Sequence, residues 1–285
     1  MKAIDNEGLQ LISEIVIQKI NTSGIYCFGE KKQIQVVQNP FQESVSNQKE
    51  HTHFYLLVIT NEIIDNATAD IADIVREKTG GRYTVTLLLH KATSLRHLAP
   101  SKLHFFHEVL TKSQIVFEHV NFPPSVAFAG QPKRNLDSMR SHWNNRKKIA
   151  EVYLKNESQV DRSNAQIIQE SMLHTSVEQI CLGLIDLFLS YQPNHFATAY
   201  LFEICEVFTP ITSEIFPQTT KEDKKLFDLL KAHPNKLRWA TLKTSDFLNT
   251  EILERRCNLF QERASELVES ELNRLENIQL KLQEP

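Results

Sequence analysis

Two histidine pairs in this sequence have a spacing that could hold a metal ion. His51 and His53 are two positions apart at the edge of a predicted β-strand, so both side chains could share one face. Imidazoles arranged in this way can bind zinc or nickel. His104 and His107 lie one turn apart in a predicted helix. Neither pair has an evident third ligand in the sequence, and two exposed histidines are the commoner arrangement, so we expect no metal site.

A second group of polar residues belongs to the C-terminal half. His174 and Glu178 are four positions apart in a predicted helix and therefore face the same way. His195 follows the turn after that helix, and Arg238 follows the third helix of this half. The four residues are candidates for a binding groove. Surface pairing and hydrogen bonds at helix ends would explain the same residues without a ligand.

A basic segment precedes this half. Residues 131–148 contain six Lys or Arg and one acidic residue, whereas residues 166–285 contain 18 acidic and 12 basic residues. Cationic residues interleaved with an aromatic ring suit phosphate contacts and base stacking. We favour the alternative, a solvated connecting helix that pairs with the acidic half. The basic patch consists of Lys133, Arg134, Arg140, Trp143, Arg146, Lys147 and Lys148.

The overall composition is that of an ordinary globular protein. Of the 285 residues, 41% are apolar and 24% charged, and the net charge of −3 does not by itself imply binding to nucleic acid or membrane. Only seven residues are glycine. The adjacent pair Gly80-Gly81 predicts a helix C-cap and turn, and the sequence has no Walker or Rossmann glycine pattern.

Cysteine usage and hydropathy predict a cytoplasmic protein without a membrane span. The four cysteines are widely spaced and form no CxxC pair, which argues against a zinc ribbon or a disulfide framework. The first residues are too acidic for a signal peptide. The most apolar stretch, residues 180–189, is interrupted by Asp186 and is shorter than a membrane span.

The N-terminal half alternates predicted helices and strands, which is typical of an α/β domain. Residues 54–59 form a continuous apolar run, as expected for a central strand covered on both faces. Residues 39–51 are polar and contain Pro40, and they predict a loop. The predicted helices are 7–20, 66–78 and 102–110, and the predicted strands are 25–28, ending at Gly29, then 34–37, 54–59, 83–89 and 115–117.

The C-terminal half predicts helices alone. Apolar residues recur every three or four positions, as in the stripe of Leu173, Val177 and Ile180, and short connections favour an antiparallel bundle. Ser163 with Gln166, Thr220 and Thr250 are the predicted N-terminal caps. The fold class is therefore α+β, with a domain at 1–122, a basic connecting helix at 123–162 and a bundle of four to five helices at 163–285.

Parts of the first half resemble the minimal nucleotidyltransferase fold. In that fold a strand ends in Gly-Ser and the next strand carries Asp-x-Asp before an apolar run. The matching segments are Ile25-Tyr26-Cys27-Phe28-Gly29-Glu30 and residues 53–59, and residues 104–110 with 115–117 resemble the closing part of the module. The resemblance implies a small mixed sheet.

The second half resembles HEPN domains, which are fused behind such modules in Bacteroidetes-type bacteria. The similarity lies in residues 172–174, 178–179, 191–193, 226–230 and 237–239. In those domains one end of the bundle forms a polar groove that can hold a nucleotide or RNA. The resemblance therefore implies a groove formed by His174, Glu178, His195 and Arg238, and a homodimer formed through the helical bundle.

Both families' catalytic motifs are missing. Nucleotidyl transfer needs carboxylates that hold two Mg²⁺ ions, but His53 and Tyr55 stand at the aspartate positions and Glu30 replaces the serine after Gly29. The predicted strand 83–89 has no acidic residue, so neither Mg²⁺ nor another cofactor is expected. HEPN ribonucleases carry an arginine followed five to seven residues later by histidine, and no Arg of the C-terminal half has this partner.

The resulting hypothesis is a non-catalytic, regulatory protein that binds a nucleotide or nucleic acid, related to toxin–antitoxin-like systems. One alternative is an enzyme, either a divergent HEPN ribonuclease that uses His174, Glu178, His195 and Arg238 or a nucleotidyltransferase. Another is a structural protein that assembles through its helical bundle.

Overall fold

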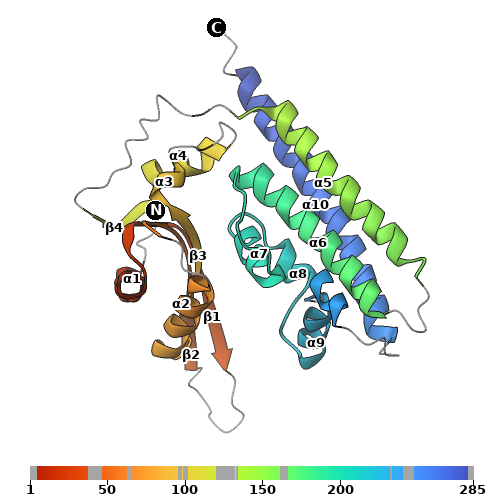
Figure 1. Cartoon of the computed structure of the whole chain (residues 1–285), viewed down its shortest axis with the longest axis horizontal. Helices are drawn as coiled ribbons and strands as arrows, with labels where there is room; N and C mark the ends of the chain where they lie inside the picture. The colour runs from red at the N-terminus through yellow and green to blue at the C-terminus, as the bar shows by residue number, and fades with distance from the viewer. Residues whose placement is uncertain are drawn as a thin grey trace. The chain divides into compact units, whose positions relative to one another are not determined.

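The computed structural model describes residues 5–37, 47–62, 66–95, 98, 102–119, 132, 134–160, 166–231, 233–239 and 247–281. The chain divides into two compact units, Met1–Pro132 and Lys133–Pro285 (Figure 1). The first unit is a small mixed sheet with helices and the second is helical, which confirms the predicted α+β class. Two predicted residues, Lys133 of the basic patch and the cap Ser163, lie outside the described residues.

The sheet of the first unit has four strands in the order β3-β2-β1-β4. β1 pairs antiparallel with β2 and β4, whereas β2 and β3 are parallel and are connected through α2. A tight turn reverses the chain and can join only antiparallel strands. Two neighbouring parallel strands therefore need a longer crossover connection such as this helix. The strands are β1 (Thr22–Val37), β2 (Asn47–Thr60), β3 (Tyr83–Lys91) and β4 (Gln114–Glu118).

β1 corrects one prediction. The sequence predicts two short strands, 25–28 and 34–37, with a break at Gly29, but Thr22–Val37 is one continuous strand. Gly29 lies inside it, at a shift in the pairing register, and a Cβ at this position would come within 3.1 Å of the Tyr55 ring. The glycine therefore marks a bulge where two strands approach closely. β2 begins at Asn47, so the end of the predicted loop 39–51 is also strand.

Helices cover both faces of this sheet. α1 (Asn6–Lys19) and α2 (Ala67–Lys78) share one apolar core with alternate strand residues such as Leu56 and Leu87. α4 (Leu103–Lys112) brings Phe105 to the other face, where its ring contacts Phe28 edge-on at 5.7 Å. Residues 54–59 are all buried, which confirms the predicted central strand. α3 (Ala92–Leu95) follows β3 directly.

The turn after α2 is the predicted helix C-cap. Gly80 and Gly81 have φ values of 55° and 80°, which only glycine adopts without strain. The Gly81 N–H donates to the Arg76 carbonyl and closes the helix end.

Three long helices form the frame of the second unit (Figure 1). Arg146 of α5 contacts Gln179 of α6, and Arg134 contacts Leu187, so these two helices are antiparallel. α5 also runs antiparallel to α10, because Arg140 pairs with Glu276 whereas Glu151, further along α5, accepts from Gln261, earlier in α10. The elements are α5 (Leu136–Glu157), α6 (Gln166–Leu189), α7 (Thr198–Cys205), α8 (Ile211–Ile215), α9 (Lys221–Leu230), the 3₁₀ helix η2 (Pro234–Arg238) and α10 (Phe247–Lys281).

α5 lies in the segment 123–162 that the sequence assigns to a connecting helix, and it packs against α6 and α10, the pairing with the acidic half that the sequence analysis favours. Thr250 is not the cap of α10, because the helix begins at Phe247 and the Thr250 side chain is buried in the first turn. The capping box at Thr220 and Asp223 is present at the start of α9.

α6 is the central helix of this unit. It is long and apolar enough to cross a membrane by length and composition, and 61% of its most apolar window is buried inside the unit. Such burial is typical of a core helix. Leu173, Val177 and Ile180 are fully buried, which confirms the predicted stripe.

Candidate ligand pocket and histidine–glutamate cluster

A pocket of about 440 Å³ opens in the helical unit. Its wall combines one residue of α6, the segment that leads into α7, and the turn after α9. Three of the lining side chains are imidazoles, one is an ammonium and one is an aromatic ring. The lining residues are His174, His195, Phe196, Ala197, Thr198, Ala199, Lys231, His233 and Asn235.

His174 is a buried residue of the pocket, with 2% of its surface exposed. Its Nδ1 lies 2.9 Å from the Leu230 carbonyl oxygen and 3.1 Å from Thr198 Oγ1. A carbonyl oxygen only accepts, so Nδ1 carries a proton and donates it, and Nε2 is the ring nitrogen that faces Glu178. These contacts fasten α6 to the start of α7 and to the end of α9.

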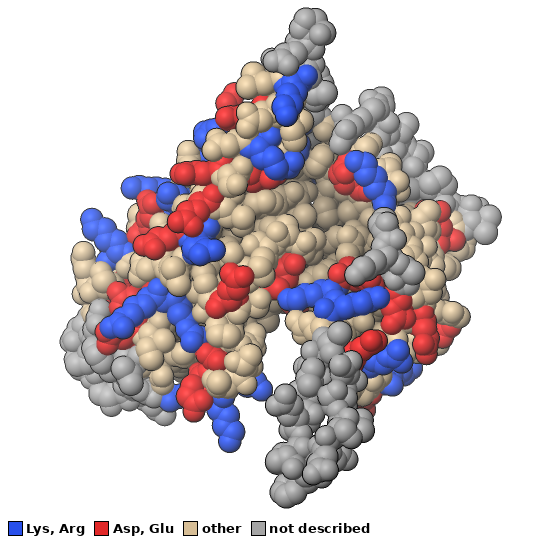
Figure 2. Space-filling view, turned by 180° about the vertical axis from the view of Figure 1, so that it is seen from behind, with Lys and Arg blue, Asp and Glu red and all other residues tan. Residues whose placement is uncertain are grey.

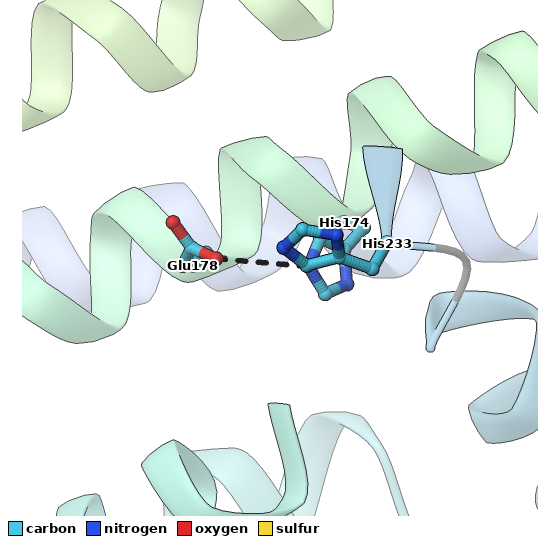
Figure 3. Close-up of side chains that lie close together, drawn as sticks. All are labelled: His174, Glu178 and His233. Carbon is cyan, nitrogen blue, oxygen red and sulfur yellow. Dashed lines mark ion pairs between the residues drawn. The ribbon is translucent and has the colours of Figure 1, made fainter. Parts of the chain in front are cut away.

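Glu178 lies one turn further along α6. Its Oε2 is 3.7 Å from His174 Nε2, so the predicted pair faces the same way (Figure 3). Its other oxygen, Oε1, accepts from the Gln179 side-chain amide at 3.4 Å. Gln179 in turn accepts from Arg146 of α5 at 2.6 Å. The carboxylate is therefore connected through Gln179 to the neighbouring helix.

His233 completes a cluster that the sequence analysis missed. Its ring lies edge-on to that of His174, with centroids 5.1 Å apart, and Figure 3 shows the two rings together with the Glu178 carboxylate beside them. One ligand atom from each of the three residues lies within 4.8 Å of the others. The sequence does hold one indication of its role. His233 lies between the end of the predicted third helix and Pro234, where the helix must stop and the chain can turn back toward the bundle.

The other two predicted groove residues lie apart from this cluster. His195 lines the pocket, and its exposed ring packs edge-on against Tyr200 at 5.1 Å. Arg238 is exposed at the end of η2 and is not among the described lining residues. The structure thus brings His174 and His195 into one pocket with Glu178 next to it, and leaves Arg238 outside.

Lys231 supplies the positive charge at the pocket. Its ammonium pairs with Asp228 at 2.9 Å and lies 4.9 Å from the centre of the Phe227 ring. Phe196, in the segment that leads into α7, is 46% exposed. An exposed ring and an ammonium in one pocket suit a ligand that is flat at one end and anionic at the other.

His53, one of the two residues that the sequence analysis compares with aspartates of the resembled fold, belongs to a hydrogen-bond network between β2 and β3. His53 Nδ1 lies 2.7 Å from Thr84 Oγ1, and its Nε2 lies 2.9 Å from Thr86 Oγ1. His51 Nε2 lies 3.0 Å from the same Thr84 hydroxyl, so the two histidines share one face of the strand as predicted. Burial, together with the charge of Lys31, lowers the pKa of His51.

Tyr55 and Glu30, the other two residues of that comparison, make contacts within the first unit. Tyr55 is buried, with its ring against Gly29. Glu30 pairs with Lys32 at 3.4 Å and accepts from the Asp5 N–H at 3.4 Å.

The basic patch is largely engaged within the helical unit. Arg134 donates to the Leu187 carbonyl and lies 3.8 Å from Glu271, and burial lowers the pKa of its guanidinium. Trp143 is buried, with 4% of its surface exposed. Lys148 is exposed and Lys147 is half-buried. Figure 2 shows Lys and Arg interspersed with Asp and Glu over the face that it presents.

Comparison of the sequence with protein-family models and with curated proteins gave no match.

Proposed function

We propose that this chain is a non-catalytic, regulatory nucleotide-binding protein of the nucleotidyltransferase–HEPN type, and that the nucleotide binds in the pocket of the helical unit. The observation that carries the proposal is the combination of Lys231, His195 and the exposed Phe196 ring around one cavity. Its volume of about 440 Å³ lies within the usual range of small-molecule sites.

Each part of a nucleotide has a matching group in this wall. The Lys231 ammonium and the imidazoles suit phosphate oxygens, because charge-assisted hydrogen bonds are stronger than neutral ones. The Phe196 ring offers a face for base stacking. The Asn235 amide can both donate and accept, as recognition of a base edge requires.

The absence of catalysis follows from the chemistry of β2 and β3. Mg²⁺ prefers oxygen ligands, with one or two carboxylates among them. His53 and Tyr55 stand where the resembled module has aspartates, and β3 (Tyr83–Lys91) contains no Asp or Glu. The hydrogen bonds of His53 to Thr84 and Thr86 are structural contacts between strands. These hydrogen bonds support the proposal that the first unit keeps the sheet of the resembled fold but lacks its metal site.

Isothermal titration of the full chain with AMP, ADP, ATP and inorganic phosphate tests the proposal. We expect nucleotide binding to weaken about tenfold in Lys231→Ala and in His195→Ala, since a hydrogen bond to a charged group contributes about 1.5–3 kcal/mol. Lys224→Ala is the matched control, because Lys224 is exposed on the same helix and is not among the lining residues. A chain that binds none of the nucleotides, or a Lys224 variant as weak as the Lys231 variant, contradicts the proposal.

The non-catalytic part has its own test. The chain is incubated with Mg²⁺ and a labelled nucleoside triphosphate, with RNA or protein as acceptor. We expect no incorporation of label. Magnesium-dependent incorporation would show that the first unit is an active enzyme.

A further inference from the structure

We propose that His174, Glu178 and His233 form a binding site for one divalent first-row metal ion, with Zn²⁺ as the best fit. The site shares two residues with the pocket but rests on a separate observation, the buried and unsatisfied Nε2 of His174. Two imidazoles and one carboxylate are a ligand set that zinc accepts, with a fourth position open for water or substrate.

The spacing of the three groups is close to what zinc needs. Ligand atoms about 2.0–2.1 Å from a tetrahedral ion lie about 3.4 Å from each other. His174 Nε2 and Glu178 Oε2 are 3.7 Å apart, and the whole set lies within 4.8 Å (Figure 3). Small rotations of Glu178 and His233, which are less buried than His174, would bring the atoms to bonding distance.

His174 is held as a metal ligand would be. Its Nδ1–H donates to the Leu230 carbonyl, which fixes the ring and leaves Nε2 directed toward Glu178 as the nitrogen available to a metal ion. Nε2 is buried and has no hydrogen-bond partner within the described part of the chain. A buried acceptor without a partner is costly, and a bound cation would satisfy it. Metal-ligating histidines commonly donate their other N–H to a backbone carbonyl in this way.

Glu178 has a supporting group of its own. The Gln179 amide donates to Oε1 at 3.4 Å, which leaves Oε2 on the side of the histidines. Arg146 donates to Gln179 at 2.6 Å and holds that amide from α5. Such outer groups orient ligating carboxylates. Arg146 and Gln179 are therefore positioning residues in this proposal.

His233 is the adjustable ligand. Its Nδ1 accepts from the Asn235 N–H at 3.0 Å, so a metal ion that binds at this ring replaces that hydrogen bond or requires the turn to release it. The ring also lines the pocket, which gives the ion a path from solvent. The nearby Lys231 ammonium is paired with Asp228, and that pairing reduces its repulsion of a cation.

Zinc titration of the metal-free full chain tests the site without any nucleotide. We expect one Zn²⁺ per chain, bound at least about 100-fold more weakly in Glu178→Gln and in His233→Ala, and about 10–100-fold more weakly in Gln179→Ala. His195→Ala is the matched control, a pocket histidine outside the cluster, and it should bind zinc like the wild type. With Co²⁺ in place of zinc, the visible absorption of a tetrahedral site should appear in the wild type and be lost in Glu178→Gln. Circular dichroism checks that each variant is folded.

The proposal is overturned if the folded wild type binds no stoichiometric zinc or if His233→Ala binds it as tightly. It is also overturned if affinity is lost in His51→Ala/His53→Ala instead, because the ion would then lie on β2. Zinc binding without nucleotide binding would support this site and show that the proposed function is wrong. Nucleotide binding without zinc binding would support the proposed function and show that this site is wrong.

Discussion

Trp143 of α5 fills the space in front of Gly183 of α6. A Cβ built on Gly183 would lie 2.7 Å from Trp143 Cε3, far inside van der Waals contact. The glycine therefore lets a large ring pack directly on the α6 backbone. This packing explains why Trp143, a candidate for base stacking in the sequence, is buried in the bundle.

The substitution Gly183→Ala should destabilise the helical unit. The added methyl group forces the buried indole to move, and overpacking of this kind costs about 1–3 kcal/mol. Alanine favours a helix by about 1 kcal/mol over glycine, so the net loss should be at most about 2 kcal/mol. Urea unfolding followed by circular dichroism measures it.

A double-mutant cycle with Trp143→Phe separates the contact from other effects. The smaller ring relieves the clash, so the double variant should lose less stability than the sum of the two single variants. If the two losses simply add, the close packing is not the reason for this glycine.

The fold was predictable wherever the signal is local. The α6 stripe repeats every three or four residues, and burial of Leu173, Val177 and Ile180 follows from that repeat alone. The length of β1 was not predictable in this way. Gly29 looks like the end of a strand in the sequence, but β2 pairs with β1 on both sides of this glycine. Whether a glycine breaks a strand or forms a bulge depends on that non-local partner.

The candidate site divides in the same way. His174 and Glu178 were paired correctly because a spacing of four residues places two side chains together on any helix. His233 is 59 residues from His174 along the chain, and only the packing of α9 against α6 brings their rings to 5.1 Å. Arg238 was placed in the groove by resemblance, but η2 leaves it exposed.

The N-terminal cap of α9 should contribute to the stability of the pocket wall. Thr220 Oγ1 accepts from the Asp223 N–H at 3.0 Å, and Arg256 of α10 donates to the Asp223 carboxylate at 2.9 Å. Loss of a threonine cap costs about 1 kcal/mol, so Thr220→Ala should lower the free energy of unfolding by that amount. Thr219→Ala is the control, since Thr219 contacts Asp223 but does not cap the helix. Equal losses in both variants would contradict the assignment of the cap.

The homodimer expected from the sequence has a specific candidate surface on α5. Ile149, Val152 and Tyr153 lie on one side of the helix and are 41%, 46% and 36% exposed. If this stripe forms the interface, Val152→Asp should shift the chain toward monomer, because it buries a charge. Light scattering over a range of concentrations measures the shift. Asn144→Asp adds the same charge at an exposed site of α5 and should leave the dimer unchanged. A wild-type chain that is monomeric throughout rules the dimer out.

Acid should destabilise the first unit through His90. Burial, and secondarily the charge of Lys102, lower the pKa of this imidazole to about 4, against 6.5 for an unperturbed ring. Above the unperturbed value the ring is neutral in both the folded and the unfolded chain, so it contributes no pH dependence there. Between the two values the unfolded chain binds a proton that the folded chain does not, and stability therefore falls as the pH falls. The loss from this one group should reach about 2 kcal/mol near pH ~5 and no more than about 3 kcal/mol in total.

Urea unfolding of the wild type and of His90→Asn, at neutral and mildly acidic pH, measures this loss. The asparagine variant cannot titrate, so its stability should fall less on acidification than that of the wild type, by about 2 kcal/mol. Other histidines contribute equally to both curves and cancel in the difference. Gln18→Ala is the control, because Gln18 is exposed on α1 and cannot titrate, so its replacement should leave the slope unchanged. The burial of His90 against the Phe106 ring, 5.0 Å away, predicts that only the first variant flattens the curve, and parallel curves for His90→Asn and the wild type would be incompatible with it.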